Sequence, residues 1–303
     1  MLHSRGLEDM SKPRTFTVLV ATDGSEQGTA AVNATITFPW PSGARVRGVV
    51  VRGPVITSEV PEFVLADIER SLVGVAADAK KVLARRWPGA EVRVIDGPTV
   101  DAIVGHADQA GASVIVLGSR GHGPIARLLL GSTSLGVVRR MKHAALVVRG
   151  STRAVTRVAV GLDGSPCARH ALDSLTRLQA PKGGRVTIVR VLEQTRMPSL
   201  AALPPSARNV IAAQATAVAA AEEKRVGREN DAAAARLQRA GWKVDVTVRK
   251  GAPLHELLAA TERARAQLLV VGARGHSAVE RLLLGSVAEG ALHRCPVSVL
   301  VVR

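Results

Sequence analysis

Short apolar runs alternate along the chain with longer segments in which apolar residues recur at helical spacing. The continuous apolar run 16–21 is typical of a strand that is buried on both faces, as in a parallel sheet. Strands alternating with helices over short connections predict a parallel sheet covered by helices on both faces. The predicted strands are 16–21, 45–51, 91–95, 113–117 and 145–148, and the predicted helices are 26–38, 62–86, 99–110 and 132–141.

The same order of elements occurs twice, because the first half of the chain is repeated in the second half. The segment 18–25 (VLVATDGS) recurs as 158–165 (VAVGLDGS) at an offset of 140 residues, and later matches have an offset of 154. The second copy therefore has 14 extra residues, which lie after its second strand, around the proline-containing stretch 197–205. We expect two tandem domains after a flexible N-terminal segment. The expected parts are 1–15, 16–150 and 154–303, and the second copy has strands at 186–192, 244–248, 267–271 and 297–302 and a long helix at 206–240.

Composition narrows the class of protein. Hydrophobic residues make up 47% of the 303 residues, which permits packed cores and excludes a wholly disordered chain. Aromatic residues make up only 2%, which argues against nucleic-acid modules that stack bases on aromatic rings. Cys167 and Cys295 are too few for a disulfide framework or a four-ligand zinc site, and they suit a reducing compartment. Because no membrane span or secretion signal is evident, we expect a cytoplasmic protein without a membrane partner.

The net charge of +16 attracts anions such as nucleotides, nucleic acid or an acidic membrane face. Arginine and lysine are scattered along the predicted helices and strand ends, and no block of five or six like charges occurs. This distribution favours diffuse surface charge over a nucleic-acid site. A basic scaffold that binds nucleic acid without using a nucleotide stays an alternative.

Candidate chemistry lies at the carboxyl ends of the strands, where parallel α/β sheets bind ligands. Asp-Gly-Ser follows the first strand of each copy, and the spacing G-x2-G-x9-G-S follows the fourth, at 118–132 and 272–286. Such glycines let the backbone approach phosphate oxygens and adopt positive φ, and the last one opens a helix whose N-terminus favours phosphate. Two matches at equivalent positions predict two phosphate-binding loops. The alternative is that the glycines only shape turns.

Both halves resemble domains of the universal stress protein family, and the chain from about residue 16 to its last residue resembles the tandem members of that family. The glycine spacing is similar to that of the family's ATP-binding subgroup. The resemblance implies α/β domains with doubly wound, five-stranded parallel sheets of the adenine nucleotide alpha-hydrolase-like fold. It also implies fifth strands that pair at the sheet edge, so that 145–148 and 297–302 can form a pseudo-dimer within the chain.

The resemblance assigns one set of ligand contacts to each copy. In each copy an aspartate contacts the adenosine, and backbone groups near a valine bind the edge of the adenine. The glycine loop and the start of the following helix hold the phosphates. In the first copy these residues are Asp23, Val51, Gly118, Gly121, Gly131, Ser132, Thr133 and Ser134. In the second copy they are Asp163, Val191, Gly272, Gly275, Gly285, Ser286 and Val287. An arginine inside each loop, Arg120 or Arg274, is placed to pair with phosphate bidentately.

Other interpretations of these residues stay open. The two aspartates can simply cap Asp-Gly turns. His122 and His276 follow the second loop glycine and are interpreted as solvated loop residues rather than phosphate contacts. The family often has a second Ser or Thr two positions after the motif serine, which is Ser134 in the first copy but Ala288 in the second. We therefore rank the first site above the second.

Signatures of several nucleotide-using enzymes do not occur. The sequence has no G-x4-G-K-(S/T) of a P-loop NTPase, no S-G-G-x-D-S after its first strand and no H-x-G-H. No general base is evident, so we expect no catalytic residue and no metal ligand, with Mg²⁺ only on ATP phosphates. The expected function is ATP binding by a nucleotide-responsive regulator of stress survival, with an unidentified protein partner and a homodimer of tandem chains. The alternatives are a slow ATPase or self-phosphorylating enzyme and the scaffold named above.

Overall fold

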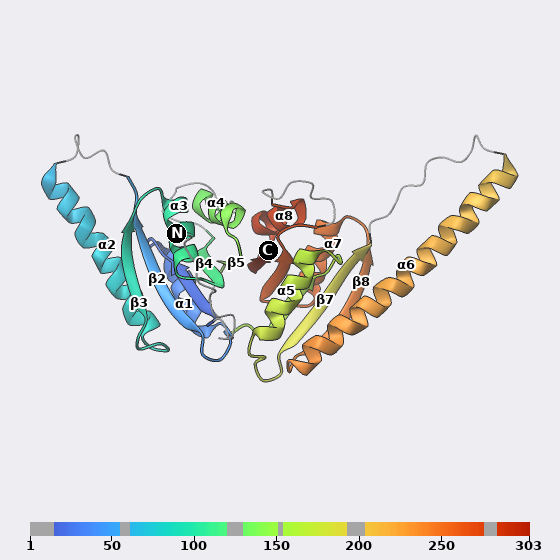
Figure 1. Cartoon of the computed structure of the whole chain (residues 1–303), viewed down its shortest axis with the longest axis horizontal. Coiled ribbons are helices and arrows are strands. Elements are labelled where there is room, and N and C mark those ends of the chain that lie inside the picture. Colours follow the sequence, from blue (N-terminus) through green and yellow to red (C-terminus); the bar gives the residue numbers. More distant parts are fainter. Residues whose placement is uncertain (1–14, 55–60, 120–129, 151–153, 193–203, 276–283) are drawn as a thin grey trace, which may run out of the picture.

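Ten strands form one continuous sheet in the computed structural model (Figure 1). The structure describes residues 15–54, 61–119, 130–150, 154–192, 204–275 and 284–303. The strand order is β3-β2-β1-β4-β5-β10-β9-β6-β7-β8, so each half of the chain contributes five neighbouring strands. All strands within one half are parallel. The strand order reverses between β1 and β4 and again between β6 and β9, which is where ligands bind in such sheets.

The elements of the first half follow the alternation that the sequence predicts. They are β1 (Thr17–Ala21), α1 (Glu26–Thr37), β2 (Arg45–Arg52), α2 (Glu62–Leu83), β3 (Glu91–Asp96), α3 (Thr99–Gln109), β4 (Val114–Gly118), α4 (Ser132–Arg140) and β5 (Ala144–Val148). The second half repeats this order. Its elements are β6 (Arg157–Gly161), α5 (Pro166–Arg177), β7 (Arg185–Leu192), α6 (Pro205–Arg239), β8 (Lys243–Lys250), α7 (Pro253–Arg263), β9 (Leu268–Gly272), α8 (Ser286–Arg294) and β10 (Ser298–Val302). Each predicted strand and helix is present, with ends that differ by up to three residues.

Two hydrophobic clusters cover the two faces of the sheet. In β1, Val18 and Val20 belong to one cluster and Leu19 to the other, and all three are fully buried. The first cluster includes residues of α1, α2, α5 and α6, and the second includes residues of α3, α4, α7 and α8. Burial on both faces explains why the central strands are continuous apolar runs rather than alternating ones.

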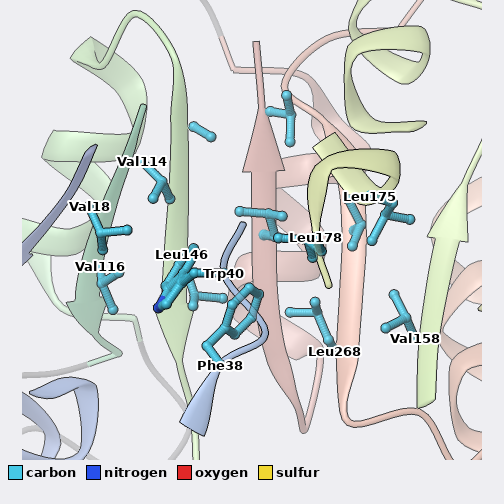
Figure 2. Close-up of a cluster of buried hydrophobic side chains, with 14 of the residues drawn as sticks. Val18, Phe38, Trp40, Val114, Val116, Leu146, Val158, Leu175, Leu178 and Leu268 are labelled. Carbon is cyan, nitrogen blue, oxygen red and sulfur yellow. The ribbon is translucent and has the colours of Figure 1, made fainter. Parts of the chain in front are cut away.

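The two halves meet through β5 and β10, which pair antiparallel. This is the contact between fifth strands that the sequence analysis expects. Leu146 of β5 lies opposite Leu300 of β10, and both are buried in the same cluster. Figure 2 shows Leu146 beside Phe38 and Trp40, within a cluster that continues to Val158 and Leu175 of the second half. The core is therefore shared across the junction.

The extra residues of the second copy mainly lengthen a helix. The helix α2 has 22 residues and α6 has 35. The last buried leucines of the two helices, Leu83 and Leu237, keep the repeat offset of 154, so most of the added length lies at the N-terminal end of α6. Figure 1 shows that this end of α6 extends away from the sheet.

Candidate functional site

The Asp-Gly-Ser segments form tight turns at the carboxyl ends of β1 and β6. Asp23 Oδ1 accepts hydrogen bonds from the Ser25 backbone N–H at 3.0 Å and from the Ser25 hydroxyl at 2.5 Å. Asp163 Oδ1 accepts from the Ser165 backbone N–H at 2.8 Å. Gly24 and Gly164, which lie between the aspartate and the serine of each turn, have φ values of 77° and 89°, which glycine adopts most easily. One carboxylate oxygen of each aspartate therefore holds a turn, as the simpler interpretation states.

The second carboxylate oxygen of Asp163 faces the glycine loop. A β-carbon added to Gly275 would lie 2.8 Å from Asp163 Oδ2, so the two residues are in contact. Ser165 also joins the turn to the loop, because its hydroxyl donates to the Arg274 carbonyl at 3.1 Å. Asp163, Arg274 and Gly275, which the sequence assigns to one site, lie together in the structure.

The first motif glycine of each copy has a packing role. A β-carbon on Gly118 would lie 2.5 Å from the Gln27 carbonyl oxygen, and one on Gly272 would lie 2.8 Å from the Ala168 backbone nitrogen. The ends of β4 and β9 thus lie directly on the first turns of α1 and α5. Only glycine permits such a close approach of two backbones. These two glycines are therefore required for close packing of a strand end on a helix, which neither the phosphate-binding nor the turn-shaping interpretation predicts.

The last motif glycine of each copy precedes a helix, as expected. The Gly131 N–H donates to the Ser119 carbonyl and the Gly285 N–H to the Ala273 carbonyl, both at 2.8 Å. No side chain of the described residues caps α4 or α8, so the first N–H groups of both helices point outward without an intrahelical partner. Such helix ends favour anions.

The expectation of positive φ at these glycines is wrong. Gly131 and Gly285 have φ of −64° and −69°, and Gly118 and Gly272 are ordinary strand residues. Their backbone conformations suit any residue. The physical requirement at Gly118 and Gly272 is space, because a β-carbon there would overlap neighbouring backbone atoms.

Ser134 makes a structural hydrogen bond. It is buried, and its hydroxyl donates to the Gly118 carbonyl at 2.6 Å. The single hydroxyl proton is therefore used within the fold and is not offered to a ligand. Ala288, its counterpart, is also buried. The difference between the two copies thus gives no physical reason to rank the first site above the second, and that ranking stays a prediction.

A large cleft opens at the carboxyl edge of the second half. Its volume is about 1810 Å³, and it extends from the β6 and β9 ends to α6, α7 and α8. The sequence-assigned residues of the second copy that line it are Asp163, Val191, Gly272, Arg274, Gly275, Gly285, Ser286 and Val287. All eight assigned positions of that copy are thus brought to one cavity.

The first copy presents the equivalent residues at the carboxyl ends of its own strands. Asp23 is exposed after β1, Val51 is half-buried near the end of β2, and Gly118 ends β4. Gly131, Ser132, Thr133 and Ser134 lie at the start of α4. Arg120 and Gly121 lie outside the described residues, as do His122 and His276.

The cleft also contains residues that the sequence analysis did not identify. One wall is an apolar stripe on the extended part of α6, formed by Ile211, Ala215, Val218 and Ala219. Arg190 of β7 lines the cleft as well and is only 4% exposed. Comparison of the two copies could have identified this arginine, because the equivalent residue of the first copy, 140 positions earlier, is the apolar Val50.

The charge of the second cleft is mixed. Arg274 and Lys250 line it together with Glu222 and Glu223 of α6. Burial lowers the pKa of Arg303, and the nearby positive charge of Arg274 acts in the same direction. The positive charges of Arg274 and Arg303 therefore lie close enough to affect each other.

Neither a metal-binding cluster nor a membrane-spanning helix is found within the described residues. No three His, Cys, Asp or Glu side chains in these parts of the chain are grouped so that they could hold a metal ion. Among the described helices, none combines the length and the apolar character that crossing a membrane requires.

The fold and the site define a class: a tandem, doubly wound α/β protein with its candidate sites at the carboxyl edge of each half-sheet. The model of the universal stress protein family matches residues 15–149 and 154–303. The chain therefore belongs to the universal stress protein family. Both matches together cover nearly the whole chain, which agrees with the duplication in the sequence.

Relatives and solved structures agree with this assignment. A universal stress protein of Mycobacterium tuberculosis is 31% identical over 204 residues, which is 63% of this chain and 62% of that relative. This chain thus matches less than two thirds of the length of that relative. A universal stress protein of Bacillus subtilis is 29% identical over 144 residues, 44% of this chain and 97% of its own. The crystal structure of a universal stress protein from Archaeoglobus fulgidus covers 96% of this chain and 99% of its own, with a TM-score of 0.64 and 22% identity, and supports the fold.

Proposed function

We propose that both domains bind ATP at the carboxyl edge of their half-sheets and that the protein is a nucleotide-responsive regulator of stress survival. The observation that carries the proposal is the cleft of the second domain. The eight residues between 163 and 287 to which the sequence assigns nucleotide contacts line this one cavity. The ends of β6, β7 and β9 share one edge of the sheet, and the cleft at this edge is where doubly wound sheets bind ligands.

The proposed contacts follow from the groups present. At the start of α8, the backbone N–H groups of Ser286 and Val287 would hold phosphate oxygens, assisted by the helix dipole. Arg274 adds positive charge beside them. Asp163, at the end of β6, would accept a hydrogen bond from the nucleoside, and the backbone near Val191 would bind the base edge. When bound, Mg²⁺ would be carried by the phosphates rather than by protein ligands.

The first test combines identification of copurified nucleotide with ATP titration calorimetry. Ser286→Asp places a carboxylate at the first position of α8. A negative charge there stabilises the helix by roughly 0.3–1 kcal/mol but repels phosphate. Ser132→Asp is the matched change at the start of α4. We expect two ATP per chain for the wild type and one for each variant. Absence of both copurified nucleotide and binding heat in the wild type would exclude the proposal.

The regulatory part of the proposal rests on the domain junction. Arg139 of α4 and Glu289 of α8 form an ion pair across the junction, with Nη2 and Oε1 2.6 Å apart. The Arg149 side chain of the first half also donates to the Leu292 carbonyl of α8. These contacts connect the two helices that would bind phosphate. Occupancy of one site is therefore expected to change the affinity of the other site, and to change the surrounding surface that would contact a protein partner.

Hydrogen exchange of the Ser132→Asp variant tests this connection. Only the second site can then bind ATP, yet we expect ATP to increase protection in both α8 and α4. Protection confined to α8 would show that the domains respond independently. The protein would then be an ATP binder without the proposed coupling.

A further inference from the structure

The N-terminal part of α6 is an exposed helix that carries almost no charge. The helix begins at Pro205, and the first of its described side chains that is buried is Val226. Figure 1 shows this part of α6 projecting beyond the sheet. Residues 209–221 include no charged residue, although Val210 and Val218 are 65% and 64% exposed. A helix in water normally carries charged side chains, so this segment has the composition of a helix that packs against a partner.

Helix propensity alone does not account for this composition. Alanine is the best helix former, and the many alanines of 205–225 help the helix to persist without tertiary contacts. Closer to the domain the helix also uses charges, since Arg225 pairs with Glu222 and Glu229. The isoleucine and the two valines of the exposed segment do not help an isolated helix, because β-branched side chains are poorer helix formers than alanine. Contact with another surface explains their presence.

These apolar residues share one face of the segment. At about 100° per residue, Ile211 and Val218 project within about 60° of the direction of Ala215. Arg208 and Glu222, seven residues to either side of Ala215, project within about 20° of it. Four of these residues, all but Arg208, line the same cleft, which agrees with a common face. The face is therefore apolar in the middle, basic at its N-terminal end and acidic at its C-terminal end.

We propose that this face docks on the same face of a second copy of the chain, as an antiparallel pair of α6 helices centred on Ala215. Each copy then contributes the same surface, as in other two-fold dimers. Arg208 of each copy lies level with Glu222 of the other, so two identical contacts between opposite charges close the ends of the pair. Ile211 of each copy lies beside Val218 of the other. The helix dipoles run in opposite directions, which also favours the pair.

The length of the exposed segment selects the same centre. Ala215 is the midpoint of 205–225, the part of α6 that precedes its first buried side chain. Pairing there overlaps the whole exposed segment, over about 30 Å at 1.5 Å per residue, and ends where each helix enters its own domain. The two domains then lie at opposite ends of the pair. Ala212 and Ala219, which also lie on this face, let the helices approach closely.

The charges favour the antiparallel orientation over the parallel one. In a parallel pair Arg208 would lie level with Arg208 and Glu222 with Glu222, and both contacts would be repulsive. The antiparallel pair also brings Arg208 of one copy to the cleft of the other, because Glu222 lines that cleft. The second copy would thus add a positive charge to the mouth of each cleft.

Sedimentation velocity of the full chain over a concentration series tests the pairing. We expect a reversible dimer of the wild type. Arg208→Glu should weaken the dimer at least about tenfold, because two attractive contacts become repulsive, and Glu222→Arg should do the same. The double variant, Arg208→Glu with Glu222→Arg, should restore the dimer. Far-UV circular dichroism should show equal helix content in all four proteins, since both side chains lie outside the buried core.

Cysteine cross-linking tests the register. Ala215→Cys places a thiol of each copy at the two-fold axis, where diamide should oxidise the two thiols to one intermolecular disulfide. Ala213→Cys is the matched control, because this exposed alanine lies on the opposite face, about 160° away. The native Cys167 and Cys295 are buried and should not cross-link.

A wild type that stays monomeric up to its solubility limit would overturn the inference. A dimer that neither charge reversal weakens would place the interface elsewhere, and equal cross-linking through positions 213 and 215 would refute the register. Binding of the wild type to vesicles of anionic lipid without dimer formation would assign this face to a membrane surface instead. Loss of the dimer in both single variants and its return in the double variant would establish the contact between Arg208 and Glu222.

Discussion

Truncation of Leu146 at the junction should destabilise both halves of the protein. Leu146 is 1% exposed, lies opposite Leu300 of β10, and belongs to the cluster that extends through both halves. Leu146→Ala removes three buried carbons, worth about 2.4 kcal/mol of transfer free energy at roughly 0.8 kcal/mol each. The cavity left behind adds to this, so we expect a loss of about 3–4 kcal/mol in the free energy of unfolding.

Urea unfolding followed by far-UV circular dichroism measures this loss, and hydrogen exchange locates it. Protection should fall in β4 of the first half and in β9 of the second, because the strands on both sides of the junction share one core. Val73→Ala is the control, since Val73 is 55% exposed and its truncation should change stability by less than about 0.5 kcal/mol. A loss below about 1 kcal/mol for Leu146→Ala, or one confined to the first half, would contradict the shared core.

Three further predictions concern single positions. Burial lowers the pKa of His106 from its ordinary 6.5, so the folded protein binds this proton less readily, and stability should fall as the pH drops below 6.5. His106→Ala introduces the residue found at the equivalent position of the second copy, and it should flatten the pH dependence of the urea midpoint between pH 5 and 6.5. An unchanged slope would show that His106 is not the group responsible for the loss of stability. Gly272→Ala drives a β-carbon into the backbone of α5 and should cost about 1–3 kcal/mol, whereas Gly275→Ala displaces only a carboxylate and should cost less; equal urea midpoints would refute the packing role. Burial raises the pKa of the Cys295 thiol, so native protein should resist alkylation by iodoacetamide at neutral pH until urea unfolds it, and rapid native alkylation would be inconsistent with that burial.

The fold could be predicted because the sequence repeats its own pattern. A segment such as 16–21 is ambiguous by itself, since short apolar runs occur in strands and in buried helices. Its recurrence at 156–161, before the same Asp-Gly-Ser turn and the same order of elements, removes that ambiguity. The ends of helices were less accurate: the predicted helix 62–86 ends at Leu83, because the fraying of the last turn depends on tertiary contacts.

The sequence predicted which residues of the candidate site lie together in the second half, but not the structural role of several of them. The residues that the glycine spacing assigns to the second copy line one cleft, but positive φ is not the reason for these glycines. Gly131 and Gly285 have negative φ, and Gly118 and Gly272 are strand residues that avoid a backbone collision. That collision involves α1 or α5, which are distant in sequence. No local pattern reports such a contact. The role of Ser134 was missed for the same reason, because its partner is the carbonyl of Gly118, sixteen residues away.

Comparison of the two copies separates what the fold requires from what a ligand requires. Gly118 and Gly272 are kept in both copies, and both are explained by close packing of a strand end on a helix. Val50 and Arg190 differ, although both are buried at equivalent positions of the same sheet. In the first copy an apolar residue is sufficient at this position. The second copy holds a charged side chain with an unpaired donor there, and a contribution to stability does not explain that choice. Arg190 is therefore the more informative residue about function, because the first copy shows that the fold does not need it.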